Sequence, residues 1–261
     1  MAGQEVVKSQ IAEMRDLIQK SLPQIKLAIP KHLNADRMAR IAMTEFQKNP
    51  DLAKCNPLTF IASIIQASQL GLEPGILGQA YLIPYKTTCT FVPGWKGLVD
   101  LMSRTGRATV WTGAVFEGDE FRYSIGSTPF IDHRPAGEDD PNKITHFWAC
   151  GRVNGSEIPV IEVWTAAKVK KHLDRFNKIG SGHYAYRHWE MYGRKIALLQ
   201  VLKYMPMSVE EAAGRALATG IAVANAEDSG EFVDAAVVGF ETVIDNPADD
   251  MEKVLTGEAG K

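Results

Sequence analysis

The sequence predicts an α+β protein in which a small antiparallel sheet is flanked by helices. Two observations support this fold class. Apolar residues recur at helical spacing in the N-terminal third and again after Thr165, whereas residues 108–164 are rich in β-forming residues interrupted by glycine, aspartate and proline. Helices and strands therefore follow one another in blocks and do not alternate, which argues against a parallel βαβ fold.

Three helices are expected in the N-terminal third. Pro23 is expected to close the first helix, because proline lacks the amide hydrogen that a helix interior needs. The third helix starts at Asn56-Pro57, a capping residue followed by proline at the first helical position, and it ends at Gly71. The three helices are expected over residues 5–22, 35–48 and 57–70.

The remaining elements are predicted from turn and cap signals. Asn154-Gly155 is a strong signal for a hairpin turn, and Thr165 is expected to cap the helix that follows the hairpin. Strands are expected over residues 79–85, 89–93, 146–153 and 157–164, and helices over residues 94–104, 166–176, 184–202 and 209–223.

The charge of the chain is unevenly distributed. The net charge is −2, but residues 225–261 hold ten acidic residues and two lysines, so residues 1–224, with 27 basic and 21 acidic residues, carry +6. A basic body attracts polyanions, and an acidic tail either competes for the same surface or meets another partner. The sequence thus predicts a core over residues 1–224 and a disordered acidic tail over residues 225–261. A domain with a solvated tail explains the same charges without any nucleic acid.

Several kinds of chemistry lack their sequence signatures. The chain has no P-loop, no GxGxxG after a strand, and no CxxC, HExxH or EF-hand loop. No apolar run is long enough to cross a membrane, and the N-terminus has no secretory signal. The cysteines and five of the histidines are too scattered for disulfides or zinc sites, so ordinary core or surface roles are expected. These residues are Cys55, Cys89, Cys150, His133, His146, His172, His183 and His188.

One acidic segment is a candidate for metal-dependent hydrolysis. Glu117, Asp119 and Glu120 place three carboxylates in four residues, which could hold Mg²⁺ in a nuclease. A polar turn between two strands is the favoured explanation, because two-metal sites usually draw their carboxylates from separate elements. We therefore expect no hydrolytic active site, and the nuclease remains the alternative from the enzyme class.

Basic and aromatic residues point to nucleic acid. Two glycines flank Trp95-Lys96, so a strand could come close while Trp95 stacks on a base and Lys96 neutralises a phosphate. In the helix expected over 184–202, aromatic residues alternate with arginine and lysine, a pattern that suits a single strand. The alternatives are that Trp95 fills the core and that the basic faces are merely solvated. The candidate DNA-binding residues are Trp95, Lys96, Arg104, Arg107, Lys168, Lys171, Arg175, Arg187, His188, Tyr192, Arg194, Lys195 and Lys203.

An ordered set of motifs resembles the RecT family of single-strand annealing proteins. The longest is TFIASIIQASQLGLEPG at residues 59–75, followed by AYLIPY at 80–85 and GWKG at 94–97. The chain departs from the founding member at Trp95-Lys96, where that protein has Tyr-Arg, and it carries fewer basic residues over 194–200. Further matches lie at residues 117–121, 133–135, 145–146, 188–191, 202–206 and 243–246.

The resemblance implies a function and partners. It implies ATP-independent binding of single-stranded DNA and annealing of complementary strands in homologous recombination, by a ring or helical filament of subunits. No cofactor is required, with Mg²⁺ at most a modulator of annealing. The implied partners are the annealed duplex, a phage exonuclease and the host single-strand binding protein through the C-terminal region. The implied setting is bacterial cytoplasm, with a phage or prophage origin. The remaining alternative is a scaffold whose acidic tail recruits replication proteins.

Overall fold

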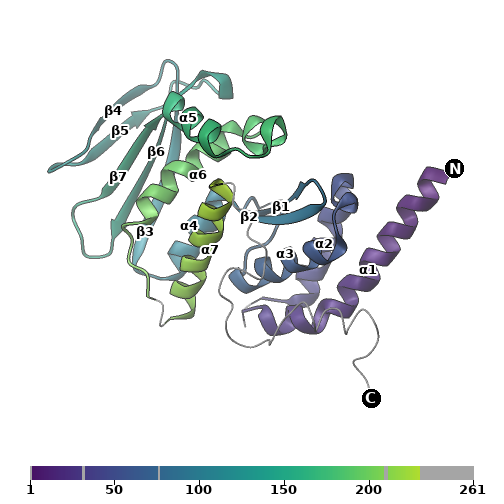
Figure 1. The fold of residues 1–261 in the computed structure, drawn as a ribbon. Coiled ribbons are helices and arrows are strands. Elements are labelled where there is room, and N and C mark those ends of the chain that lie inside the picture. The colour runs from purple at the N-terminus through teal and green to yellow at the C-terminus, as the bar shows by residue number, and fades with distance from the viewer. Residues whose placement is uncertain (1, 31–32, 76, 209–210, 230–261) are drawn as a thin grey trace. The chain divides into compact units, whose positions relative to one another are not determined.

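The computed structural model describes residues 2–30, 33–75, 77–208 and 211–229, with backbone only for residues 2–8, and its fold is α+β as expected (Figure 1). The described residues form two compact units. The first unit holds those of residues 1–75 and 82–91, and the second holds those of residues 77–81 and 92–229. Residues 230–261 lie outside the described residues, so the disorder expected for the acidic tail stays a prediction.

The first unit is built on three helices. Their shared core is lined by large apolar side chains, among them Ile18, Phe46 and Phe60. The tip of a two-stranded hairpin packs on the third helix, where the Cys89 amide donates a hydrogen bond to the Thr59 hydroxyl at 2.9 Å. The elements are α1 (Ala2–Ala28), α2 (Ala35–Lys48), η1 (Pro50–Lys54) and α3 (Pro57–Leu70), and the hairpin strands are β1 (Ala80–Tyr85) and β2 (Thr88–Pro93).

Local signals explain the boundaries of α2 and α3. The Asn34 side chain accepts a hydrogen bond from the Arg37 amide at 3.0 Å, and the Asn56 side chain accepts one from the Leu58 amide at 2.9 Å. Gly71 ends α3 with φ 63°, a left-handed conformation that glycine adopts without strain. These expected boundaries are confirmed.

The expected end of the first helix is wrong. Helix α1 continues through Pro23 to Ala28. The turn after the proline carries Ile25, which is completely buried. An interior proline costs a helix about 3 kcal/mol, and burial of the following turn offsets that cost.

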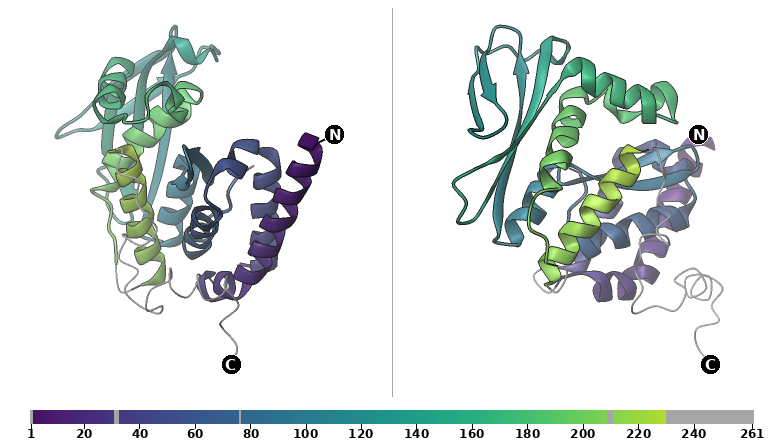
Figure 2. Two further views of the ribbon diagram at one scale, coloured as in Figure 1. Left: turned by 45° about the vertical axis from the view of Figure 1, so that its right-hand side comes forward. Right: turned by 60° about the vertical axis from the view of Figure 1, so that its left-hand side comes forward.

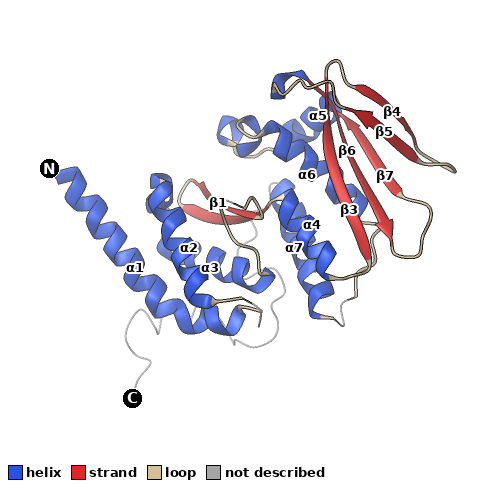
Figure 3. Cartoon of the chain, turned by 180° about the vertical axis from the view of Figure 1, so that it is seen from behind, coloured by secondary structure: helices blue, strands red, loops and turns tan. Residues whose placement is uncertain are grey.

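The second unit is an antiparallel sheet covered by helices. Its sheet has the order β3-β6-β7, and a separate hairpin pairs β4 with β5 (Figure 3). The turn at Asn154-Gly155 between β6 and β7 is confirmed, with φ 83° at Gly155. The strands are β3 (Ala108–Phe116), β4 (Glu120–Ser124), β5 (Phe130–Arg134), β6 (Ile144–Val153) and β7 (Val160–Thr165). The helices are α4 (Trp95–Arg104), η2 (Pro141–Lys143), α5 (Ala166–Phe176), η3 (Gly180–Gly182), η4 (Tyr184–Tyr186), α6 (Trp189–Leu202) and α7 (Ala212–Asp228).

Helix α6 is the central helix of this unit. It packs across the sheet on the same side as α5, and α7 packs against it in turn (Figures 1 and 2). Two glycines allow the close approach. A Cβ at Gly193 would lie 2.3 Å from the Phe147 ring, and one at Gly151 would lie 2.7 Å from Val201. Helix α6 is therefore buried along most of its length.

Two helix boundaries differ from the prediction. The long helix begins at Trp189 and not at residue 184, because the His183 ring accepts a hydrogen bond from the Ala185 amide at 3.1 Å and holds a separate 3-10 turn. Helix α7 extends to Asp228, so Glu227 and Asp228 belong to a folded helix and not to the predicted tail.

Candidate nucleic-acid interface

Helix α5 presents an exposed row of cations. The Thr165 hydroxyl caps the helix by accepting a hydrogen bond from the Lys168 amide at 3.1 Å. Val169 and Leu173 are buried and anchor one face. The opposite face carries Lys168, Lys170, Lys171 and Arg175, all exposed. Because only Val169 and Leu173 of this helix are buried, most of its surface is accessible to a ligand.

Most of these cations make no ion pair in the part of the chain that the structure describes. Lys170 contacts Asp174 at 3.5 Å, the one carboxylate paired with the row there. The Lys168 Nζ lies 3.7 Å from the centre of the Trp164 ring, a cation–π contact that leaves the charge unneutralised. We call the exposed cations Lys168, Lys170, Lys171, Arg175 and Arg187 the α5 surface.

The loop between α5 and α6 adds to this surface. Arg187 and His188 are both exposed and have no ion pair among the described residues. Tyr186, which precedes them in the chain, is 50% exposed. An exposed aromatic residue next to free cations suits a single strand, whose bases stack while its phosphates are held. The structure thus leaves five of the predicted residues exposed and without an ion pair in the part of the chain that it describes: Lys168, Lys171, Arg175, Arg187 and His188.

The Trp95-Lys96 turn is a second group of aromatic and basic residues. Lys96 is exposed, but Trp95 is half-buried. The Trp95 Nε1–H points at the Met191 sulfur at 3.1 Å, and the Arg194 guanidinium stacks 3.9 Å from the ring centre. One face of Trp95 is therefore already occupied, which restricts the predicted base stacking to the opposite face of the ring.

Tyr81 belongs to this group and was not predicted. It is 38% exposed. Both Tyr81 and Lys96 lie against Gly78, since a Cβ built on this glycine would lie 3.1 Å from the Tyr81 hydroxyl and 3.4 Å from Lys96 Cδ. Burial raises the pKa of the Tyr81 hydroxyl, so it is a neutral hydrogen-bond donor near neutral pH. The alternation of buried Ala80 and Leu82 around Tyr81 was the available signal, since it directs the tyrosine outward.

Two residues predicted to touch DNA are in the core. Tyr192 is 1% exposed, and its hydroxyl donates a hydrogen bond to Asp228 Oδ1 at 3.0 Å. Lys195 is 2% exposed, and its Nζ lies 2.5 Å from Glu227. These positions contradict the predicted stacking and phosphate contact. The reason is that α6 is enclosed by the sheet and by α7, so its basic and aromatic residues face other helices.

Tyr192 and Lys195 belong to a buried polar cluster that joins α5, α6 and α7. His172 Nε2 lies 2.6 Å from Asp228, and His183 Nε2 lies 3.9 Å from Glu227. Burial, with the nearby Lys195 charge, lowers the pKa of His183 to about 4, so this histidine is neutral at physiological pH. The cluster anchors the last turn of α7.

The other predicted cations have partners on the surface. Arg104 pairs with Asp100 at 2.5 Å, and Arg107 pairs with Glu211 at 2.9 Å. Lys203 is exposed and donates to the Gln200 side chain at 2.6 Å. Surface pairs of this kind are weak, so a phosphate can compete with them, but these cations are less available than those of the α5 surface.

Arg194 is held in place more firmly. Its guanidinium donates to Glu190 at 3.0 Å and to the Thr112 carbonyl at 2.7 Å while it stacks on Trp95. Its side chain is 19% exposed. We conclude that Arg194 fixes Trp95 against α6 and β3.

The acidic segment forms a turn. The Asp119 side chain is 1% exposed and accepts hydrogen bonds from the Phe116 amide at 2.8 Å and the Ala136 amide at 2.7 Å, and it pairs with His133. Burial acts to raise the pKa of Asp119, but these hydrogen bonds outweigh it and hold the pKa below its usual value. The described residues contain no group of three or more metal-ligating side chains. The turn expected at residues 117–120 is thus supported over the metal site.

The cysteines are core residues, as expected. Cys55, Cys89 and Cys150 are free thiols and buried. Burial raises the pKa of Cys89 to about 12 and of Cys150 to about 11, which keeps both protonated and unreactive at neutral pH.

Among the described residues, no helix is long and apolar enough to span a membrane.

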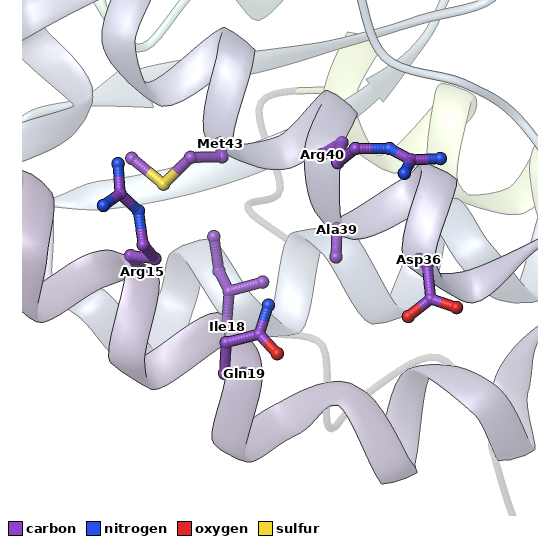
Figure 4. Close-up of a pocket in the computed structure, with 7 residues that line it drawn as sticks. All are labelled: Arg15, Ile18, Gln19, Asp36, Ala39, Arg40 and Met43. Carbon is purple, nitrogen blue, oxygen red and sulfur yellow. The ribbon is translucent and has the colours of Figure 1, made fainter.

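The first unit contains a groove between α1 and α2. It has a volume of about 400 Å³ and an apolar floor of Ile18, Ala39 and Met43. Arg15 and Arg40 stand on opposite sides of this floor, as Figure 4 shows. Neither arginine makes an ion pair within the described part of the chain. The groove could take an apolar segment that carries negative charge.

Exposed lysines and arginines beside half-exposed aromatic rings define a class, the proteins that bind single-stranded nucleic acid. The comparisons with known proteins narrow this class. A family model described as "RecT family" matches residues 36–234, and the chain belongs to that family. Protein RecT of Escherichia coli (strain K12) is 36% identical over 197 residues, which cover 72% of each chain. The uncharacterized protein YqaK of Bacillus subtilis (strain 168) is 29% identical over 163 residues, 61% of this chain and 55% of that protein.

Membership of this family establishes the general function. The chain is a recombination-related, DNA-binding protein that anneals single strands. The resemblance identified from the sequence motifs is confirmed.

Proposed function

We propose that the protein binds single-stranded DNA without sequence preference and pairs it with a complementary strand as an oligomer, without ATP. The α5 surface carries this proposal, since four of its five cations lie on a helix whose other face is anchored in the core. Such cations release counterions from the phosphates, which yields affinity for any sequence and a steep dependence on salt.

The mechanism uses positioning alone. Phosphates contact the α5 surface and Lys96, while the Tyr81 ring and the face of Trp95 opposite Arg194 stack on bases. The strand is held extended with its pairing edges open to a second strand. Stacking and pairing in the new duplex supply the driving force, so no hydrolysis is needed. We propose that Mg²⁺ acts at most as a modulator of repulsion between the two strands.

We also propose that the protein associates with itself through the first unit. Leu27 of α1 is 79% exposed, and the groove between α1 and α2 adds an apolar surface beside two arginines. An apolar surface of this kind supports contact with a second copy. We further propose that residues 230–261, which follow α7, meet the exonuclease and the single-strand binding protein of a bacterial host, since an acidic segment with an apolar stretch at residues 237–244 suits partner docking.

The test is annealing of two complementary, fluorophore-labelled oligonucleotides without ATP, at low and moderate salt. We expect faster pairing of intact DNA, and weaker acceleration at higher salt. The variant Lys168→Ala/Lys171→Ala/Arg175→Ala should lose most of the acceleration. Its matched control is Lys20→Ala/Lys48→Ala/Lys54→Ala, which removes the same charge from exposed positions of the first unit and should anneal normally.

Three outcomes would contradict the proposal. Shortened strands in Mg²⁺ would indicate the nuclease. Tight binding without any acceleration would indicate the scaffold. Equal losses in both triple variants would mean that net charge, and not the α5 surface, determines binding.

A further inference from the structure

A pocket lies beside the α5 surface in the second unit. It has a volume of about 370 Å³, at the small end of the range for ligand sites. Its floor is apolar and buried, with Ile144, Leu173 and Ala185 each at most 6% exposed. Its walls come from η2, α5 and the η4–α6 segment.

Two aromatic rings line this pocket. Trp189 is half-buried and held edge-on against Phe147, with ring centres 5.6 Å apart. Tyr186 is 50% exposed, and its hydroxyl lies 3.4 Å from the Asn177 side-chain amide. One ring is therefore fixed by the core and the other stands at the solvent edge. A flat apolar ligand would be in contact with both.

The charges at the pocket are positive. Lys170 lines it, no carboxylate does, and Arg187 follows Tyr186 directly in the chain. An apolar aromatic cavity with cations at its edge is complementary to a nucleotide, which joins a flat base to an anionic phosphate.

We propose that this pocket takes one unpaired nucleobase of the bound single strand, with the adjoining phosphate held by Lys170 and Arg187. The inference rests on the proposed function and adds a base subsite to it. Holding one base fixes the strand on each subunit, while the neighbouring bases stay available for pairing. Sequence preference is not expected, because the walls offer rings and methyl groups that fit any base.

The test compares two ligands of equal length, an oligo-dT and an abasic oligonucleotide that keeps the phosphates and sugars but has no bases. Affinities are measured by fluorescence anisotropy for the intact protein and its variants. The wild-type protein should bind oligo-dT more tightly than the abasic strand. Ala167→Leu fills the pocket from an exposed position of α5, and Tyr186→Ala removes the outer ring. Each should lower the preference for oligo-dT about tenfold and leave abasic binding unchanged.

Two controls separate the base from the phosphate. Tyr204→Ala removes a tyrosine that is 64% exposed and does not line the pocket, and it should leave the preference as in the wild type. Lys171→Ala should weaken both ligands equally, because it contacts phosphate only.

The results distinguish this inference from the proposed function. If the wild-type protein binds oligo-dT well but Ala167→Leu and Tyr186→Ala keep the full preference, the base subsite is wrong and DNA binding stands. If those variants change the mass of the oligomer and not the preference, the pocket takes a side chain of a second copy instead. If the wild-type protein binds neither ligand, the proposed function fails.

Discussion

Helices α5 and α6 of the second unit both carry lysine and arginine, and these charges have opposite surroundings on the two helices. On α5, Lys168, Lys171 and Arg175 are exposed and make no ion pair among the described residues. On α6, Lys195 is buried against Glu227, and Arg194 is enclosed by Glu190, Thr112 and Trp95. Similar residue types are therefore open to solvent on one helix and part of the packing on the other.

The difference follows from where each helix lies. Helix α6 is covered by the sheet on one side and by α7 on another, so a cation on it must find a partner or lose its solvation at a cost. Helix α5 buries only Val169 and Leu173 and leaves its cations in water. The comparison teaches that the burial of a helix, more than its charge pattern, decides which cations can meet DNA. Four predictions test it, ordered by their expected effect on stability.

The largest effect is expected at Lys195. Burial raises the pKa of Glu227, and Lys195 opposes that shift. Lys195→Met therefore forces the Glu227 carboxyl either to take up a proton or to stay charged without its lysine at a site only 7% exposed, and should lower the free energy of unfolding by about 3–5 kcal/mol. Urea unfolding followed by circular dichroism measures this loss. The double variant Lys195→Met/Glu227→Leu should recover most of the stability. A single variant with unchanged stability and weakened DNA binding would mean that Lys195 contacts phosphate after all.

The second prediction is that the free energy of unfolding depends on pH through His183, which belongs to the same buried polar cluster as Lys195. The pKa of His183 is about 4 in the folded protein, and an unfolded histidine titrates near 6.5. Between these values the unfolded chain takes up a proton that the folded protein excludes. The free energy of unfolding should therefore fall as pH drops from about 6.5 to 4, by up to about 3 kcal/mol.

Unfolding measured across this pH range in the wild type and in His183→Gln tests the effect. The variant lacks the titrating ring, so its stability should depend less on pH. Glu227, Asp228 and Lys195 face the site in both proteins, and burial raises the pKa of Glu227, so the histidine effect is taken from the difference between the two curves. If the free energy of unfolding changed with pH equally in the two proteins, His183 would be protonated in the folded protein over this pH range.

An intermediate effect is expected at Arg194. Arg194→Lys keeps the charge but loses the planar stack on Trp95 and one of two hydrogen bonds, which should cost about 1–2 kcal/mol. Thermal unfolding would report the loss, and tryptophan fluorescence would report the released Trp95. Unchanged stability with reduced DNA affinity would place Arg194 with the α5 surface.

The smallest effect on stability is expected on α5. Lys171→Gln and Arg175→Gln should each change the free energy of unfolding by less than about 0.5 kcal/mol. Each should weaken binding to single-stranded DNA and lower the slope of log affinity against log salt by about 0.7. Titrations at several salt concentrations measure the slope, and Lys54→Gln in the first unit is the control. A slope that stays constant in both α5 variants would remove α5 from the interface.

Much of the fold could be predicted from local chemistry. Asn34 and Asn56 begin their helices, Gly71 ends one, and Asn154-Gly155 turns the β6–β7 hairpin, all as the sequence indicates. Each of these signals acts through hydrogen bonds or backbone angles within a few residues. The exposed cations of α5 were predicted for a similar reason, since the spacing of Lys168, Lys171 and Arg175 puts them on one face of a single helix.

Only the tertiary structure decided where α1 ends and which charged and polar side chains are buried. Helix α1 continues past Pro23 because Ile25 is buried against other helices. The expectation that proline ends a helix considers only the local backbone and takes no account of such a contact. Lys195 meets Glu227 across 32 residues of sequence, and Tyr192 meets Asp228 across 36. The sequence by itself determined the elements and the positive charge of the body. Which charges face water depended on the packing of α6 between the sheet and α7, because burial is a property of contacts between distant segments.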